Sequence, residues 1–377
     1  MAEQSTFGIE EEFFLTDLKT RNIVRRRPKG FFRACKSEFG GLVSPELLQS
    51  QVELVTPILT QMDDARNCLL SARARLGVVT ELFGLGALAA GTHPMAQWHE
   101  QQATELPHYE QLFADFQMVA RRDLLCGLHV HVGVPAHLDR IVVMNRVMPW
   151  LPLLLALSTA SPFWARKRTG LMSYRQSAYD EWPRTGIPDY FQDEPAYQAC
   201  VDFLMATGSM KSDSDIRWNI RPSARFPTLE LRIADSCPAV DDVLCIAALF
   251  RAMVNHALVT PDQGLMRNGM SRLLIEENRW RAKRFGTQAA FLDQASRRNV
   301  PIEEWLDMLQ TQIGESAAAL GDSAAFVQAK TILHSGSSAD RQLRCYTAAR
   351  NAGLSRQRAL IAVVDELLAV TRSGKIL

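Results

Sequence analysis

The sequence predicts an α+β protein, with strands mostly in the first two-thirds of the chain and helices in the final third. Two observations support this prediction. Residues 1–238 alternate helix-like segments with short strand-like segments that are rich in aromatic and β-branched residues. Residues 239–377 contain long segments of helical character, separated by Gly, Pro or Ser. With 377 residues, of which 47% are hydrophobic, the chain is long enough to bury a large core, and we expect a single domain made of these two parts.

Six segments of the first part have the composition of strands. They span residues 6–15, 52–57, 85–93, 124–134, 218–221 and 228–233. The residues between the last two include Arg-Phe-Pro-Thr at 225–228, which predicts a hairpin connection.

Helices are predicted from apolar residues at helical spacing. Residues 63–82 fit this pattern, with Asp63 as the expected cap. Residues 147–165 carry no charge over 19 positions, but prolines interrupt them, so we expect a buried core helix rather than a membrane span. The second part predicts helices over residues 240–259, 266–285, 302–320, 323–333 and 356–370, and its clearest loops are 261–264 and 334–338.

Charge and cysteine content exclude several classes of protein. The 42 Lys and Arg residues balance 41 Asp and Glu residues, so bulk attraction to nucleic acid or to an anionic membrane is not expected. The seven cysteines are an odd number and contain no C-x-x-C pair, which favours a reducing cytoplasm over a disulfide framework or a zinc finger. The N-terminus lacks the basic and apolar regions of a signal peptide.

Three consecutive glutamates lie within the first predicted strand, where burying their charge is costly unless a cation neutralises it. Strand alternation places Glu10 and Glu12 on one face and Glu11 on the other, beside Phe13 and Leu15. Carboxylates on the same face repel each other, so a shared cation is the natural explanation. The alternative is a solvated edge strand whose glutamates face water.

Two histidines lie on one face of the predicted strand 124–134. His129 and His131 alternate with apolar residues. A pair at this spacing more often lines a site, as metal ligands or phosphate donors, than fills a core. Cys126 lies nearby and is expected to be a buried structural thiol.

Arginines gather around the predicted hairpin. Glu230 and Arg232 share a face of the strand 228–233, and Arg217, Arg221 and Arg225 lie just upstream. Guanidinium groups suit carboxylate and phosphate oxygens. A cross-strand ladder of salt bridges is the alternative.

Two further glutamates lie close together in the sequence. Glu53 begins a predicted strand, whereas Glu46 has the position of an exposed residue in the first turn of a helix. Together the strands would supply up to four carboxylates and two imidazoles to one sheet face. Oxygen-rich sites favour Mg²⁺ or Mn²⁺ over zinc. Carboxylates, divalent ions and arginines are what phosphoryl transfer from ATP requires.

Three motifs carry a resemblance to a known family. They are Glu10-Glu-Glu-Phe-Phe, Gly127-Leu-His-Val-His and Leu229-Glu-Leu-Arg-Ile-Ala-Asp, which in this order resemble the catalytic sheet of glutamine synthetases. Over nearly its full length the chain resembles the bacterial carboxylate–amine ligase family, also called type 2 glutamate–cysteine ligase. The resemblance implies an antiparallel, glutamine synthetase-like active-site sheet with helices packed on one side, within a single catalytic domain over residues 1–377.

The resemblance also implies a reaction. ATP would activate a glutamate-like carboxylate as an acyl phosphate, which a cysteine-like amine then attacks. The implied Mg²⁺ (or Mn²⁺) ligands are Glu10, Glu12, Glu53, His129 and Glu230. His131 is implied to lie near the transferred phosphoryl group, Arg217 to stabilise charge, and Arg232 to bind an amino-acid carboxylate. The residues expected to contact ATP are Arg175, Arg221 and Arg225. We expect a cytoplasmic homodimer that binds neither nucleic acid nor membrane.

Two other functions stay open at this point. A metal-dependent hydrolase could use His129 and His131 to bind zinc, with His93 as the obvious third ligand. A non-enzymatic sensor could keep the pocket for a nucleotide or an amino acid, although it would not need several metals.

Three further patterns are not assigned to the catalytic site. Residues 21–36 carry seven basic side chains and no acidic one, and we expect a solvated hairpin there, with contact to nucleotide or to an acidic partner as the alternative. Residues 340–342, Asp-Arg-Gln, follow a Gly/Ser loop and could form a lid. Residues 84–89 match G-x-G-x-x-A but follow a predicted helix rather than a strand, so a Rossmann site is not expected.

Overall fold

A seven-stranded sheet lies at the centre of the computed structural model, which describes residues 5–261 and 267–376. The strands in spatial order are β2 (Val43–Pro45), β3 (Gln51–Val55), β1 (Phe7–Asp17), β5 (Gly127–Gly133), β9 (Thr228–Asp235) and β8 (Ile220–Pro222), and β4 (Leu85–Leu88) also pairs with β1. Every pair in this sheet is antiparallel, and β8 and β9 form the expected hairpin. The α+β class with an antiparallel sheet is therefore confirmed.

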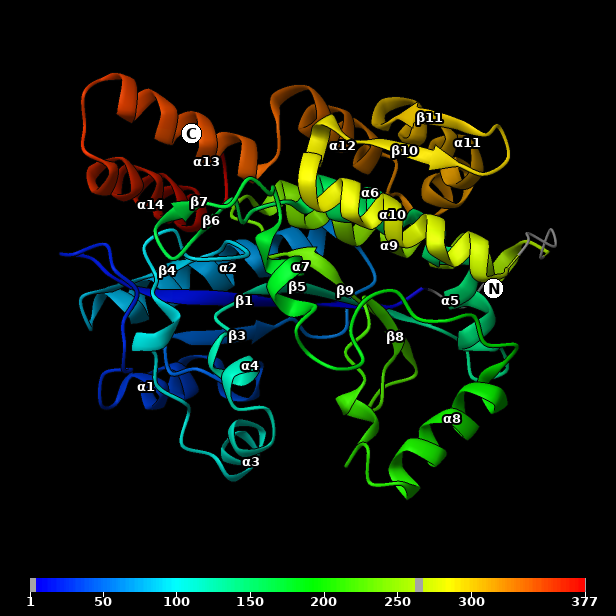
Figure 1. Cartoon of the computed structure of the whole chain (residues 1–377), viewed down its shortest axis with the longest axis horizontal. Helices are drawn as coiled ribbons and strands as arrows, with labels where there is room; N and C mark the ends of the chain where they lie inside the picture. Colours follow the sequence, from blue (N-terminus) through cyan, green and yellow to red (C-terminus); the bar gives the residue numbers. More distant parts are fainter. Residues whose placement is uncertain (1–4, 262–266, 377) are drawn as a thin grey trace.

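One face of the sheet is covered by helices, as expected (Figure 1). The helices nearest the sheet are α2 (Met62–Glu81), α5 (Arg140–Val147), α6 (Leu151–Ser158) and α9 (Val240–Val259). Further helices pack against these or against β4, namely α10 (Gly269–Phe285), α11 (Ile302–Leu320), α12 (Ala324–Ser335), α13 (Ser338–Asn351) and α14 (Arg356–Ser373). The second part of the chain is thus mainly helical.

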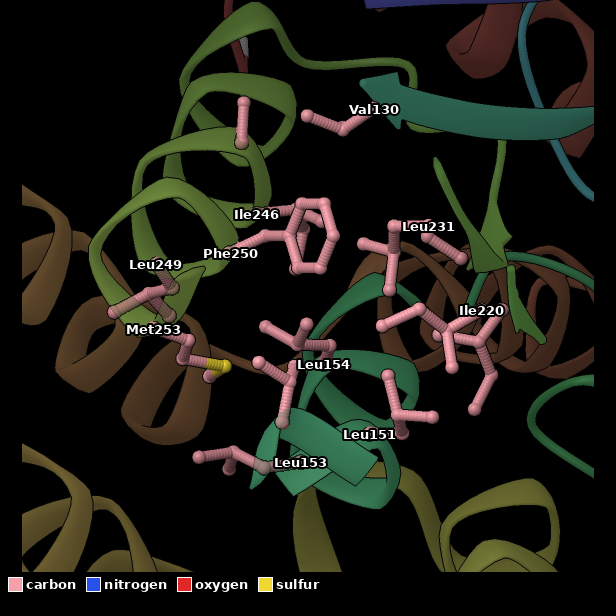
Figure 2. Close-up of a cluster of buried hydrophobic side chains, with 14 of the residues drawn as sticks. Val130, Leu151, Leu153, Leu154, Ile220, Leu231, Ile246, Leu249, Phe250 and Met253 are labelled. Carbon is pink, nitrogen blue, oxygen red and sulfur yellow. The ribbon is translucent and has the colours of Figure 1, made fainter. Parts of the chain in front are cut away.

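Strand alternation explains which face the helices cover. Figure 2 shows apolar strand residues meeting α9 and α6 in a buried cluster, whose members include Val130, Ile220, Leu231, Ile246, Phe250, Leu151 and Leu154. Burying a side chain of this size contributes about 1.5–3 kcal/mol relative to exposing it. This cluster therefore buries one face of the sheet under the helices, and the alternate residues of β1, β5 and β9 lie on the opposite face.

Two apolar helical segments are core helices of this fold. Residues 140–158 and 240–259 are long and apolar enough to cross a membrane, but 83% and 78% of their apolar windows are buried inside the structure. Pro149 and Pro152 lie in the first turns of short helical segments, where a proline does not remove a helical hydrogen bond. The buried core helix expected within 147–165 is confirmed.

Other details of the prediction were wrong. Asp63 does not cap α2, which begins at Met62 after Gln61 and has no side-chain cap. The strand expected over 85–93 ends at Leu88. Within the helical part, β10 (Ala290–Asp293) and β11 (Arg298–Pro301) form a hairpin that the sequence did not predict, because strands of four residues are too short to show clear alternation.

The remaining helices of the first part are short and flank the sheet. They are α1 (Phe31–Phe39), α3 (Pro107–Phe116), α4 (Met118–Arg121), α7 (Tyr174–Tyr179) and α8 (Glu194–Ala206), and a two-stranded hairpin joins β6 (Phe163–Trp164) to β7 (Lys167–Arg168). Residues 21–36 form a loop followed by the start of α1, not the expected hairpin. Phe31, Cys35 and Phe39 are buried at helical spacing, and their burial favours the helix.

The loop predicted at 334–338 is shorter than expected. Ser337 caps α13 in a capping box with Asp340, so the helix already begins at residue 338. The loop predicted at 261–264 and the expected helix start at 266 fall largely on residues 262–266, which lie outside the described part of the chain.

Residues 340–342 lie in the first turn of α13 and do not form a lid. Arg341 forms an ion pair with Asp242 of α9, with a distance of 3.0 Å between Nη2 and Oδ2. The Gln342 amide is buried and donates to the carbonyl oxygen of Ala160 over 3.0 Å. These contacts hold the turn against the body of the protein.

Candidate active site

The register of the sheet brings the predicted metal ligands together on its open face. Glu10 of β1 lies opposite His129 of β5, and Glu12 lies opposite Glu53 of β3. His131 in turn lies opposite Glu230 of β9. Directly opposed residues of antiparallel strands have Cβ atoms about 4.5–5.5 Å apart. Side chains from four strands therefore converge, and β1 is a central strand rather than the solvated edge strand of the alternative interpretation.

Glu10 lies between the two histidines. Its carboxylate oxygens are 3.1 Å from His129 Nδ1 and 3.2 Å from His131 Nε2. Burial opposes ionisation of Glu10, but hydrogen bonds and charge from both histidines hold its pKa well below the usual range. Burial and the nearby charge of Arg232 lower the pKa of His129. Glu10 is therefore ionised and His129 neutral, and a carboxylate and a neutral imidazole are both metal ligands.

Two sets of three side chains have ligand atoms within 4.8 Å of one another. One set is Glu10, His129 and Glu230, and the other is Glu12, Glu53 and His129. Carboxylate and imidazole donors in this proportion suit Mg²⁺ or Mn²⁺. The Nε2 atom of His129 is buried without a hydrogen-bond partner among the described residues, as expected of an atom reserved for a ligand. The five residues thus fit one or two divalent ions.

Two acidic residues of the site were not predicted. Glu46 lies on the segment between β2 and β3, where it is half-buried and lines the catalytic cavity, and it is not on a helix. Burial, followed by the charges of Glu12 and Asp123, raises its pKa well above the usual range. Burial also raises the pKa of Asp123 to about 6 and, together with Glu46, raises the pKa of Glu53. Carboxylates crowded in this way are stabilised by a bound cation.

The Ser44-Pro-Glu46 sequence explains the error. A serine followed by proline and an acidic residue is typical of a helix N-terminus, but Ser44 and Pro45 belong to β2, which pairs with β3. Proline is tolerated there because β2 is an edge strand. The β-branched Val43 and the proline at position 45 were the signals in the sequence that could have indicated an edge strand here.

Glu230 is held by two arginines. Arg221 Nε lies 2.8 Å from one carboxylate oxygen, and Arg232 forms an ion pair with the other. Burial opposes ionisation, but the charges of Arg232 and Arg221 hold the pKa of Glu230 well below the usual range. Arg232 also donates to the hydroxyl of Tyr179 over 3.2 Å. A metal ion at Glu230 would therefore share this carboxylate with two guanidinium groups.

Three arginines line a small cavity of about 70 Å³ beside these carboxylates. They are Arg175, Arg217 and Arg232, and the cavity also exposes Glu12, Glu46, Asp123, His129 and Tyr179. The Arg217 guanidinium lies 4.4 Å from the ring centroid of Trp182. Arg175 is buried and donates to the carbonyl oxygens of Arg232 and Ala234 over 3.4 and 3.0 Å. The site thus combines clustered acids with cations that could bind an anionic substrate.

The predicted ATP contacts are distributed unevenly. Arg175 lines the cavity, and Arg221 is occupied by its pair with Glu230. Arg225 is exposed on the turn between β8 and β9 and is not among the residues that line the cavity. The structure brings the first two to the site and leaves Arg225 outside it.

His93 does not join the two histidines of β5, although the alternative interpretation of a zinc hydrolase required this. The Met95 amide donates to His93 Nδ1 over 3.1 Å, so Nε2 carries the proton and donates to Thr16 Oγ1 over 3.1 Å. Thr16 lies six residues along β1 from Glu10, about 20 Å at strand spacing. Both ring nitrogens are used in a buried structural contact, which removes the third ligand of the hydrolase interpretation.

A sheet of this topology, with a helical face and an open face of acids, imidazoles and arginines, has the fold of glutamine synthetase-like ligases. Solved structures share the fold. The glutamate–cysteine ligase of Francisella tularensis, in complex with AMP, matches with a TM-score of 0.72 and 14% identity over 98% of this chain and 89% of that one. A bifunctional glutathione synthetase from Pasteurella multocida matches with a TM-score of 0.70 and 15% identity over 97% of this chain and 52% of that one.

Sequence comparison gives the family. The model of glutamate–cysteine ligase family 2 matches residues 6–360. Relatives named "Putative glutamate–cysteine ligase 2" are 50% identical over 368 residues in Ectopseudomonas mendocina (98% of this chain, 97% of the relative) and 41% identical over 370 residues in Rhodospirillum rubrum (97% and 95%). The chain belongs to glutamate–cysteine ligase family 2 and is a carboxylate–amine ligase of the glutamate–cysteine ligase type.

Proposed function

We propose that this protein uses ATP and Mg²⁺ or Mn²⁺ to activate the carboxylate of a glutamate-like amino acid as an acyl phosphate, and then joins it to a cysteine-like amine. One observation carries the proposal: two sets of metal-ligand side chains share His129, beside a cavity lined by arginines. The AMP in the structure of the Francisella tularensis ligase supports the use of an adenine nucleotide.

The acidic face would hold the metal ions. Glu10, His129 and Glu230 would bind one ion, and Glu12, Glu53 and His129 a second. Such ions, when bound, neutralise the charge that develops on a transferring phosphoryl group. Glu46, which lies in the same cavity, would add a carboxylate to the second set.

The other side chains would orient the substrates. His131 Nδ1 contacts Thr228 Oγ1 at 2.9 Å, which holds the ring so that Nε2 faces Glu10, and from there His131 would contact the transferred phosphoryl group. Arg217 would stabilise charge on the transferred group, because its guanidinium stacks on Trp182 and lines the cavity. Arg232, fixed by Tyr179, would bind an amino-acid carboxylate.

The proposed reaction has two steps. A carboxylate oxygen attacks the γ-phosphorus of ATP, and the bond to the bridging oxygen of ADP breaks. The amine nitrogen then attacks the acyl carbon, inorganic phosphate leaves with the carbon–oxygen bond pair, and the nitrogen loses a proton. Both steps build negative charge on phosphate oxygens, and Arg217 and the metal ions would stabilise this charge.

Three further properties belong to the same proposal. Residues 1–377 would act as a single catalytic domain, because α9 of the second part packs on β5 of the first. All seven cysteines are free thiols, which supports a reducing cytoplasm as the site of action. A homodimer is the assembly that we propose, since enzymes of this size are often symmetric dimers.

The experiment is ADP release from Mg·ATP across a matrix of carboxylates, amines and thiols, each tested alone and in pairs. ADP appearing only with a carboxylate–amine pair is the expected result and would identify the substrates. The Glu12→Gln variant is the matched negative control. A flat matrix without ATP binding would overturn the proposal, whereas amino-acid binding without ATP consumption would favour a sensor.

A further inference from the structure

A basic groove of about 900 Å³ lies beside the segment that carries Glu46. Its lining includes the basic residues Arg26, Arg27 and Lys29, together with Phe32, Gln49 and Thr104. One acidic residue, Glu105, also lines it and pairs with Arg26. The segment between β2 and β3 contributes to both spaces. Gln49 lines the groove beside Pro45 of β2, while Glu46 and Leu47 line the catalytic cavity. The groove is thus separate from the proposed active site but shares a wall with it.

The basic residues of this region are only partly neutralised. Three of the seven basic side chains between 21 and 36 pair with carboxylates, in the pairs Arg21–Asp365, Arg25–Glu100 and Arg26–Glu105. The last pair is 3.5 Å long and exposed, so it contributes little. Arg27, Lys29, Arg33 and Lys36 form no ion pair with a carboxylate within residues 5–261 and 267–376. Positive charge is therefore available at the groove.

Arg27 is the residue whose surroundings most clearly require a partner. Its guanidinium carbon lies 5.1 Å from the ring centroid of Phe32, which holds the side chain in place. Its Nη1 atom is buried and has no hydrogen-bond acceptor in the described part of the chain. A buried cationic donor without an acceptor is costly. Burial accordingly lowers the pKa of Arg27, and a bound anion would remove this cost.

We propose that this groove is a second binding site, which takes a small polyanion carrying phosphate groups or several carboxylates. A guanidinium and an ammonium on one wall match the charge of such a ligand. The volume lies within the range of small-molecule pockets. A concave site of this size therefore suits a small molecule better than it suits the flat surface of a macromolecule. The near-zero net charge of the whole chain makes the attraction local to this groove.

The occupant would lie one hydrogen bond from the active site. Thr104 lines the groove, and its hydroxyl donates to the carbonyl oxygen of Glu46 over 2.5 Å. The Thr104 amide also donates to the Leu47 carbonyl oxygen over 2.9 Å. A ligand that orders Thr104 therefore acts on the segment that places Glu46 in the catalytic cavity.

The test is calorimetric titration of the full chain, without ATP or metal, with pyrophosphate and separately with citrate. Sodium chloride at matched ionic strength controls for screening. The variants are Arg27→Gln and Lys29→Gln in the groove, with Arg33→Gln as the matched control, because Arg33 belongs to the same basic run but does not line the groove. Lys29 is exposed, so its variant is expected to fold even if Arg27→Gln does not. Arg217→Gln reports on binding in the catalytic cavity.

We expect saturable binding of at least one probe, weakened about tenfold or more by each groove substitution, since hydrogen bonds to charged groups are worth this much, and unchanged in Arg33→Gln. Preference for pyrophosphate would identify a phosphate ligand, and preference for citrate a polycarboxylate. The proposal is overturned if neither probe saturates, if Arg33→Gln weakens binding as much as the groove variants, or if only Arg217→Gln does so.

Discussion

The Arg175 guanidinium lies over Gly127 so closely that a Cβ atom at position 127 would be 2.3 Å from Nη2. Gly127 also donates its amide to Glu12 Oε2 over 2.6 Å. One residue at the start of β5 thus contacts both an arginine of the cavity and a carboxylate of the proposed metal site. Only a residue without a side chain allows both contacts.

The first prediction concerns this contact. Gly127→Ala should lower kcat by about 100-fold, because displacing a positioning group by roughly 1 Å costs about that much, while the protein still folds. Gly8→Ala is the steric control, since its Cβ would have ordinary contact only, 3.9 Å from Thr56 Oγ1. Steady-state kinetics with thermal unfolding of both variants would check this. Equal kcat values for the two variants would contradict the role given to Gly127.

The second prediction separates neighbouring glutamates. Glu11 is buried with Arg73 of α2, whose Nε lies 3.2 Å from Oε2, on the helix side of the sheet. Glu11→Gln should lower the free energy of unfolding by about 3–5 kcal/mol, because it leaves a buried guanidinium without its charge partner. Glu12→Gln should abolish ADP release with little loss of stability. Urea unfolding and the ADP assay distinguish the two variants. An equal loss of stability in both would refute the structural role of Glu11 and the catalytic role of Glu12.

The third prediction concerns metal binding. Because burial and mutual repulsion raise the pKa values of Glu46 and Glu53, removing a charge should stabilise the metal-free protein, and binding Mn²⁺ should stabilise it further by mass action. We expect a concentration-dependent rise in Tm with Mn²⁺, which EDTA reverses. Glu53→Gln should show a higher metal-free Tm and a smaller rise. A Tm that Mn²⁺ does not change in the wild type would exclude these sites.

The fourth prediction concerns pH. Burial lowers the pKa of His93 to about 3 from an ordinary value of 6.5. Between these values the unfolded chain binds a proton that the folded protein does not. The contribution of His93 to the free energy of unfolding is therefore complete above pH 6.5 and is lost as the pH falls.

The test compares His93→Asn with the wild type. The variant keeps an acceptor for the Met95 amide but loses the contact with Thr16, so it should be less stable at pH 7.5. The difference should shrink as the pH is lowered from 6.5 to 4.5, by up to about 1.4 kcal/mol per pH unit. Urea unfolding across this range measures it, and a constant difference would show that His93 does not remain neutral.

Some of the site could be predicted because its geometry is local. Alternation along one strand separates Glu10 and Glu12 from Glu11 without knowledge of any partner, and the structure places them on opposite faces as expected. The same rule put His129 on the face of His131. In contrast, Glu46 was misplaced because its neighbours resemble a helix start. Only the pairing of β2 with β3 makes residues 43–45 a strand and places Glu46 just after it.

The sequence by itself determined the fold class, the alternation that sorts side chains between the two faces of each strand, and the residue types that metal ions and phosphate require. Only the tertiary structure decided which of these residues meet. Glu10 opposes His129 and Glu12 opposes Glu53 because strands far apart in the chain pair in one register. Register is set by how the apolar faces pack against α2, α6 and α9, and that packing depends on the whole core rather than on any local sequence.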